Sequence, residues 1–277
     1  MTTFFYNLLV FFTWLIPGHY VWVAIVVITV LLRLAFFKPT VSMLKMQHKQ
    51  KGLQGKLKEI QRIHKDDKKA QQQAVMDLYR QEGVNPLGSC LPMIIQIVVL
   101  IGFYGVFTKI GLGKIKPEYL YSFTPRPDFI NSHFLGIDLT LKISELVKAG
   151  GVKGYLALLF PLLTGGSQLI QSLQAKASQL KPDEEEDQSA AFSRALTNQM
   201  TFLFPIMAAY ISYTLTSALS VYWITQTILM IIQQKIIINR LKIAEVVAEE
   251  VAEATGAKKI SSFKKGDVLV SVKEKEE

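Results

Sequence analysis

Hydrophobic residues in this chain are gathered into long blocks, which polar and charged stretches separate. Five of the blocks are about 20 residues long, the length that an α-helix needs to cross the hydrocarbon core of a bilayer. The pattern predicts five membrane-spanning helices, over residues 19–37, 89–108, 154–173, 198–215 and 219–238. The fold class that follows is an all-α integral membrane protein.

A shorter apolar run lies within residues 1–18 and ends at Pro17-Gly18. Because it is too short to span comfortably, we expect a short extracytoplasmic helix, either at the membrane interface or packed against the first span. A cleaved leader is the alternative, although the run lacks the Lys or Arg that precedes the apolar core of a signal peptide.

The polar segment 38–88 is basic, and apolar residues recur in it at helical spacing on both sides of a polar break at residues 64–67. This pattern predicts an antiparallel helical hairpin in water, each arm with one apolar seam. The hairpin is either a solvated loop that folds on itself or a basic arm that contacts lipid headgroups, a ribosome or an incoming chain.

The other polar segments are less regular. Residues 109–153 predict an ordered extramembrane loop with a short helix near residues 141–148. Residues 174–197 predict a polar loop, and residues 239–277 predict a tail that begins as an acidic amphipathic helix.

Basic residues are unevenly distributed among these segments. If the N-terminus is outside, the hairpin 38–88, the loop 174–197 and the tail lie inside, and they hold most of the 31 Lys and Arg residues. The positive-inside rule therefore predicts an N-terminus outside and a C-terminus inside. The net charge of +9 follows from this topology and requires no DNA partner.

One charged residue, Arg33, interrupts the first predicted span. An arginine at the bilayer centre costs about 2.5–3.5 kcal/mol on insertion scales. Since Arg33 lies about 7.5 Å along a helix from Lys38, its side chain can reach the headgroups. The alternative is a wet cavity between helices, lined by polar groups from other spans.

Motifs for covalent chemistry are absent from the sequence. There is no H-E-x-x-H zinc helix, no G-x-S-x-G elbow and no phosphate-binding loop, and no Asp or Glu lies in a predicted span. The single cysteine, Cys90, excludes an intramolecular disulfide and a cysteine cluster for metal. We predict no enzyme, no catalytic residue, no metal and no cofactor.

The spans instead offer amides and hydroxyls that, together with Arg33, predict a hydrated groove. Taken singly, such groups more often join helices by hydrogen bonds. The groups of this kind in the spans are Gln96, Ser167, Gln168, Gln171, Gln199, Thr201, Ser212, Thr225, Gln226 and Thr227. The groove residues that we single out from this pattern are Arg33, Gln96, Ser167, Gln168, Gln171, Gln226 and Thr227. A groove of this kind lowers the cost of moving polar flanks into hydrocarbon, and Arg33 attracts acidic residues on the moving segment.

Three stretches resemble the YidC/Oxa/Alb membrane protein insertases. The run V-N-P-L-G-S-C-L-P-M-I-I-Q-I at residues 84–97 resembles the family's signature. Tyr222-Trp223 followed by I-I-Q-Q at residues 231–234 resembles the family's last span, and residues 133–139 resemble the segment before an earlier one. The similarity covers about residues 20–240.

This resemblance implies a membrane protein insertase and chaperone of the bacterial cell (inner) membrane. It implies a groove open to the cytoplasm and the lipid but closed to the outside, with Arg33 as its arginine and Trp223 in its lining. It also implies that the hairpin handles substrates, with basic residues Lys45, Lys49, Lys56, Lys58, Arg62, Lys65, Lys68 and Lys69. The implied partners are nascent membrane proteins, a SecY-type translocon, a ribosome bound through the hairpin or tail, and the lipid bilayer.

The chain departs from the family's pattern at several positions. Val98 stands where a proline is common, Thr216 and Ala218 stand in a loop that often reads Pro-x-Gly, and Thr227 stands at a position that is often asparagine. About 18 residues precede the first span, as in the short bacterial form. Two other functions remain open: an anion transporter or channel with Arg33 as its anion site, and an assembly factor that binds membrane proteins without inserting them.

Overall fold

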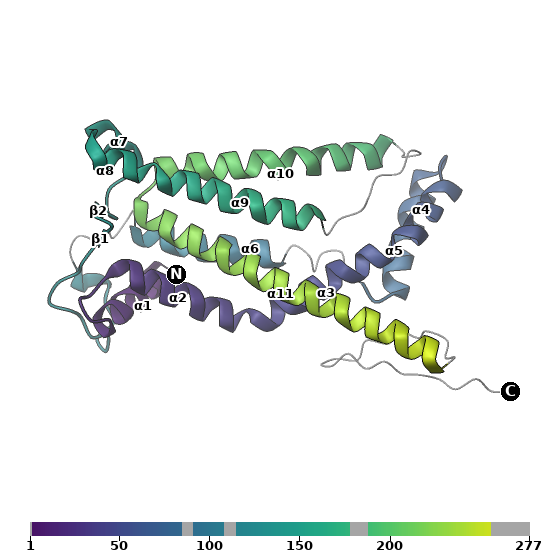
Figure 1. Cartoon of the computed structure of the whole chain (residues 1–277), viewed down its shortest axis with the longest axis horizontal. Helices are drawn as coiled ribbons and strands as arrows, with labels where there is room; N and C mark the ends of the chain where they lie inside the picture. The colour runs from purple at the N-terminus through teal and green to yellow at the C-terminus, as the bar shows by residue number, and fades with distance from the viewer. Residues whose placement is uncertain (1, 85–90, 108–114, 178–187, 256–277) are drawn as a thin grey trace. The chain divides into compact units, whose positions relative to one another are not determined.

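The computed structural model describes residues 2–84, 91–107, 115–177 and 188–255, and the described chain is almost entirely helical (Figure 1). The first half contains α1 (Thr2–Leu15), α2 (Val21–Ala35), α3 (Phe37–Gly52), α4 (Gln54–Ile63), α5 (Lys68–Gln81), α6 (Leu91–Gly105) and the 3₁₀ turn η3 (Pro117–Tyr119). The second half contains β1 (His133–Phe134), β2 (Ile137–Asp138), α7 (Ile143–Ala149), α8 (Gly151–Ala157), α9 (Leu159–Ala177), α10 (Gln188–Thr214) and α11 (Ser217–Thr255). The predicted helical fold class is confirmed.

The chain divides into two compact units, Met1–Ile231 and Ile232–Glu277. The first unit holds every element from α1 to α10 and the first turns of α11. Within its described part, the second unit is the continuation of α11, which passes the predicted end of the last span at residue 238 without a break.

Two described helical stretches are long and apolar enough to cross a membrane, Gly151–Ala175 and Ser217–Leu241. Helix α2 and the first part of α3 make a third if they are taken as one span, bent by 59°. Within the described residues, the apolar parts of α1 and α6 are shorter than a span. The count of five spans stays a prediction.

Helix α2 ends near Arg33, and the chain bends there. Phe36 leaves helical geometry, and its N–H bonds back to the carbonyls of Leu32 and Leu34. We expected the first span to end at residue 37, but a further helix, α3, begins at Phe37 and includes Pro39 in its first turn. A proline is tolerated there because the N–H that it lacks has no partner within the helix.

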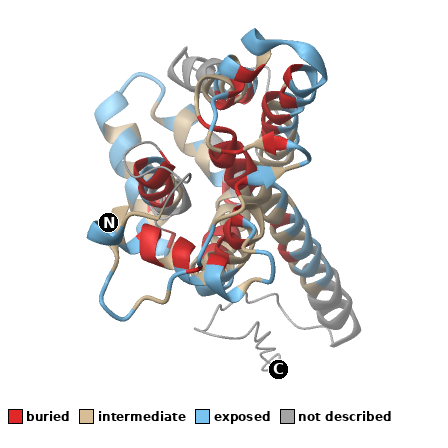
Figure 2. Cartoon of the chain, turned by 90° about the vertical axis from the view of Figure 1, so that its left-hand side faces the viewer, coloured by how far each residue is buried: buried red, intermediate tan, exposed pale blue. Residues whose placement is uncertain are grey.

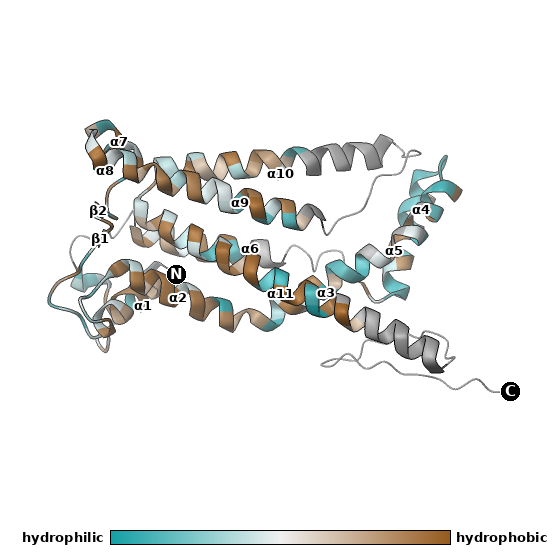
Figure 3. Ribbon diagram, viewed as in Figure 1, coloured by the Kyte–Doolittle hydropathy of each residue, from teal (hydrophilic) through white to brown (hydrophobic). Residues whose placement is uncertain are grey.

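The predicted polar break at residues 64–67 coincides with a turn between α4 and α5. His64 follows the last residue of α4. The Asp67 carboxylate then caps α5 by accepting hydrogen bonds from the N–H groups of Lys69 and Ala70, both at 3.0 Å. Figure 3 shows that α4 and α5 carry more hydrophilic residues than the apolar helices α1 and α2.

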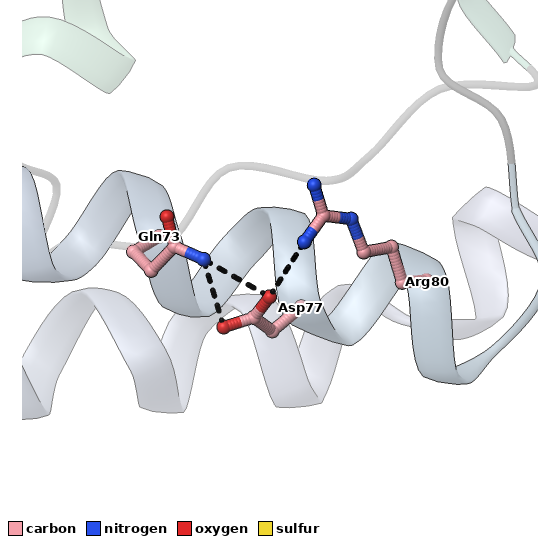
Figure 4. A network of polar contacts seen from close by, with 3 residues as sticks. All are labelled: Gln73, Asp77 and Arg80. Carbon is pink, nitrogen blue, oxygen red and sulfur yellow. Dashed lines mark hydrogen bonds and ion pairs between the residues drawn. The ribbon is translucent and has the colours of Figure 1, made fainter.

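The exposed side of α5 has a small polar network (Figure 4). The Gln73 amide donates to both oxygens of the Asp77 carboxylate at 3.1 Å, and Arg80 forms an ion pair with the same carboxylate at 3.4 Å. Because these side chains are solvated and three or four residues apart on one helix, they support α5 only by tenths of a kcal/mol, roughly 0.2–0.5 per pair.

Helix α1 is packed into the protein, as one of its two predicted placements required. Its residues Phe5, Tyr6, Leu9 and Val10 are buried within the main hydrophobic core. Figure 2 shows such buried segments in red where the helices face one another. Close packing against α6 depends on Gly102, because a Cβ there would lie 2.4 Å from the Phe5 ring.

The tight turn between α10 and α11 is tied to the preceding loop. The N–H of Ser217 donates to the Leu141 carbonyl at 3.0 Å, and the N–H of Ala218 donates to the Leu139 carbonyl at 3.1 Å. The side chain of Leu139 is fully buried in the main core. These bonds hold the first residues of α11 against the segment that precedes α7.

Candidate functional site

The Arg33 guanidinium points into the first unit and contacts α11. Its Nε donates to the Gln226 side-chain oxygen at 3.0 Å, and its Nη2 reaches the Gln226 backbone carbonyl at 3.3 Å. Its Nη1 lies 3.1 Å from the Met230 sulfur. Arg33 is half-buried, and among the described residues its hydrogen-bond partners are all neutral.

The contacts continue from Gln226 to a third helix. The Gln226 amide nitrogen donates to the Gln96 side-chain oxygen on α6. The Gln96 amide nitrogen in turn donates to the hydroxyl of Tyr222 at 3.4 Å. We call these four side chains, Arg33, Gln226, Gln96 and Tyr222, the amide chain. It brings together three of the residues predicted from sequence.

A second polar cluster lies on another side of α11. The Trp223 indole N–H donates to the Gln168 side-chain oxygen on α9 at 3.3 Å. The Gln168 amide nitrogen donates to Gln171 at 2.9 Å. Trp223 and Gln168 are both buried, each 7% exposed. Three more predicted residues are thus in contact, but with one another rather than with Arg33.

The last two predicted groove residues bond within their own helices. The Thr227 hydroxyl donates to the Trp223 carbonyl at 2.9 Å, and the Ser167 hydroxyl donates to the Thr164 carbonyl at 3.1 Å. These bonds satisfy the hydroxyls locally and connect no helices. The role of all eight residues in client binding stays a prediction.

Sequence reasoning did not place Met230 and Tyr222 in the site. Both lie four residues from Gln226 along α11, so the three side chains share one helix face. That spacing was visible in the sequence. Thr164 and Ser220 were also missed as partners of Ser212: Thr164 on α9 donates to Ser212 on α10 at 3.3 Å, and Ser212 lies 2.8 Å from Ser220 on α11.

The predicted basic residues of segment 38–88 are spread over α3, α4, the turn and α5. Lys56 forms an ion pair with Glu82 after the end of α5, and the Lys49 ammonium contacts the Glu82 carbonyl. The hydrogen bond from Lys56 lowers the pKa of the Glu82 carboxyl. Arg62, Lys65, Lys68 and Lys69 are exposed around the turn. Of the others, Lys45 is half-buried on α3, and the side chain of Lys58 lies outside the described residues.

Comparison with known proteins places the chain in a family. The family described as "60Kd inner membrane protein" matches residues 12–245. That range contains both polar clusters and the whole of segment 38–88. It also includes the signature run at residues 84–97, most of whose side chains lie outside the described residues.

Curated relatives carry the name "Membrane protein insertase YidC". One from Fusobacterium nucleatum is 26% identical over 218 residues, which cover 79% of this chain and 86% of the relative. One from Legionella pneumophila (strain Corby) is 31% identical over 219 residues, covering 79% of this chain. One from Geobacter metallireducens is 28% identical over 227 residues, covering 82% of this chain. The matched segment is 32% of the Legionella protein and 35% of the Geobacter protein, so the chain spans about a third of those relatives. The resemblance seen in the sequence is confirmed, and the chain belongs to the 60Kd inner membrane protein family of YidC-like insertases.

Proposed function

We propose that this protein is a membrane protein insertase of a bacterial inner membrane, which helps apolar segments with polar flanks to enter the bilayer and fold there. One observation carries the proposal. The positive charge of Arg33 is held inside a helical unit by neutral groups, and among the described residues no carboxylate contacts it. A charge kept in this way is available to a client.

The proposed mechanism is physical and has no covalent step. A polar or charged group that enters hydrocarbon without a partner costs several kcal/mol, about 2–7 for a neutral amide or hydroxyl. A hydrated groove lined by the amide chain and the Trp223 cluster offers intermediate solvation and lowers that barrier. Arg33 adds attraction for acidic residues in the client's tail.

The bonds of Ser217 and Ala218 to the preceding loop support a groove that is closed on the outer side. We place the N-terminus outside, the C-terminus inside, and the polar helices α4 and α5 as a hairpin in the cytoplasm, within a topology of five spans. In this arrangement the basic hairpin and the tail face the ribosome, the translocon and the inner leaflet. Clients then arrive either directly or from a SecY-type translocon.

The test is insertion into proteoliposomes that contain the purified chain. Two clients are compared that differ only in an acidic or a neutral translocated tail. Arg33→Ala is expected to lower insertion of the acid-tailed client about tenfold, the effect of losing a hydrogen bond to a charged group. Arg33→Lys, which keeps the charge, is expected to lose less.

Three results would contradict the proposal. Full insertion of the acid-tailed client by Arg33→Ala would remove the electrostatic part of the mechanism. Stable client binding without insertion by the wild-type chain would indicate an assembly factor instead. Stoichiometric flux of a small anion through the same proteoliposomes would indicate a transporter.

A further inference from the structure

The amide chain assigns a separate role to Gln226. We infer that Gln226 is a positioning residue, which holds the Arg33 guanidinium in place while leaving its charge unneutralised, and so sets the selectivity for clients with acidic tails. This inference rests on the proposed insertase function. It concerns the residue that positions the Arg33 guanidinium so that it can attract a client's acidic residues.

The first step of the argument is the direction of the hydrogen bonds. A guanidinium has only donors, so the side-chain oxygen of Gln226 must face Arg33. The Gln226 amide nitrogen is therefore directed at Gln96, whose oxygen must accept. The nitrogen of Gln96 is then left for the Tyr222 hydroxyl, as the 3.4 Å contact has it. The charge on Arg33 thus orients every amide in the chain.

The second step concerns the hydrogen bonds that hold Arg33 in place. Gln226 accepts from Arg33 with its side-chain oxygen and with its backbone carbonyl, at 3.0 and 3.3 Å. The backbone carbonyl of Gln226 belongs to α11, and the Gln96 amide that fixes the Gln226 side chain belongs to α6. Two helices therefore determine where the guanidinium lies. Met230 contributes a thioether, which is a weak acceptor and leaves the charge in place.

The third step concerns the type of residue at position 226. Glutamate has nearly the same shape as glutamine, but it accepts hydrogen bonds at both oxygens and carries a negative charge. A glutamate there would pair with the Arg33 guanidinium bidentately and cancel the charge that attracts the client. It would also remove the donor to Gln96. The neutral amide combines a fixed position with a free charge.

The experiment measures a selectivity ratio, defined as insertion of the acid-tailed client divided by insertion of the neutral-tailed client in the same proteoliposomes. A merely structural role of Gln226 would lower both insertions and leave the ratio unchanged. Gln226→Glu is expected to lower the ratio about tenfold, to the value of Arg33→Ala. Gln226→Leu, which adds no charge and releases Arg33, is expected to lower it about threefold, a smaller loss because the guanidinium stays charged.

The control for added negative charge is Gln72→Glu, at an exposed position of α5 outside the predicted spans. Its ratio is expected to stay within about twofold of the wild-type ratio, because a solvated charge is well screened. A double-mutant cycle completes the test. If Gln226 acts through Arg33, Gln226→Leu changes the ratio less than about twofold when Arg33 is already alanine.

Each outcome has a defined meaning. A wild-type ratio near one would overturn this inference together with the electrostatic part of the proposed function. A high wild-type ratio that Gln226→Glu leaves unchanged would overturn the inference alone. The same holds if Gln226→Leu lowers the ratio equally with and without Arg33, because the residue would then act on the client directly.

Discussion

The side-chain amide of Asn7 donates a hydrogen bond to the backbone carbonyl of Tyr119 at 2.9 Å and so ties α1 to a loop more than a hundred residues later in the chain. Its side-chain oxygen accepts from the Tyr121 N–H and from the Thr124 hydroxyl, both at 2.7 Å. Asn7 is 5% exposed. One buried amide therefore satisfies several polar groups of the loop.

Replacing this residue tests how firmly α1 belongs to the fold. Asn7→Ala leaves buried polar groups of the loop without partners and is expected to destabilise the protein by about 2–3 kcal/mol. Thermal unfolding in detergent measures the loss. Phe4→Ala on the exposed side of the same helix is the control and should shift the midpoint little. Equal shifts for the two variants would contradict the role given to the amide.

The contact between α1 and α6 gives a second prediction. A Cβ at Gly102 would lie 2.4 Å from atoms of the Phe5 ring, whereas a Cβ at Gly166 in α9 would have nothing within 4 Å. Gly102→Ala is therefore expected to destabilise by about 1–3 kcal/mol through overpacking. Gly166→Ala is expected to be neutral or to stabilise by up to about 1 kcal/mol, because alanine favours helix. A stable Gly102→Ala variant would show that the helices can separate at no cost.

The pairing of Glu82 with Lys56 predicts a pH dependence in segment 38–88. The pKa of Glu82 is lowered in the folded protein, so the pairing stabilises this segment above the carboxyl's ordinary pKa of about 4.3. That contribution is lost as pH falls through the lowered value. Protease cleavage between α4 and α5 should accelerate below about pH 4. Glu82→Gln should cleave faster at neutral pH and lose this part of the pH response, and a response that is identical in both proteins would refute the assignment.

The basic residues around the turn of segment 38–88 predict salt-sensitive membrane contact. If Arg62, Lys65 and Lys68 bind headgroups by charge, a chain held in neutral nanodiscs should capture anionic vesicles in about 0.05 M salt. It should release them in about 0.5 M salt, where screening is strong. Replacing the three residues by glutamine should abolish capture. Attachment that does not change with salt would indicate apolar docking.

Local patterns in the sequence predicted local structure well. The polar break at residues 64–67 became the turn capped by Asp67, and the helix expected near residues 141–148 is α7, Ile143–Ala149. The spans predicted to end at residue 215 and to begin at residue 219 are separated by a turn, but that turn lies between Thr214 and Ser217, where α11 already begins. For the turn capped by Asp67 and for α7, the determining interactions lie within a few residues of one another, where spacing and capping chemistry are visible.

Long-range relationships were not predictable in this way. The sequence identified Arg33, Gln96 and Gln226 as polar residues within spans, but which of them touch depends on how three separate helices rotate against one another. The same holds for the bend after Arg33, since Lys38-Pro39 is compatible with both a stop and a new first turn. The eight predicted groove residues therefore divide into the amide chain, the Trp223 cluster and two locally bonded hydroxyls.

The 193 residues that separate Arg33 from Gln226 also bear on how the protein itself is made. At about 5–20 residues per second of synthesis, Arg33 emerges roughly 10–40 s before the helix that holds it. Throughout that interval its guanidinium must be solvated by water or headgroups, or hydrogen-bonded to another protein. During its own biogenesis, this chain must therefore insert a charged residue into the membrane, which is the problem that it is proposed to solve for its clients.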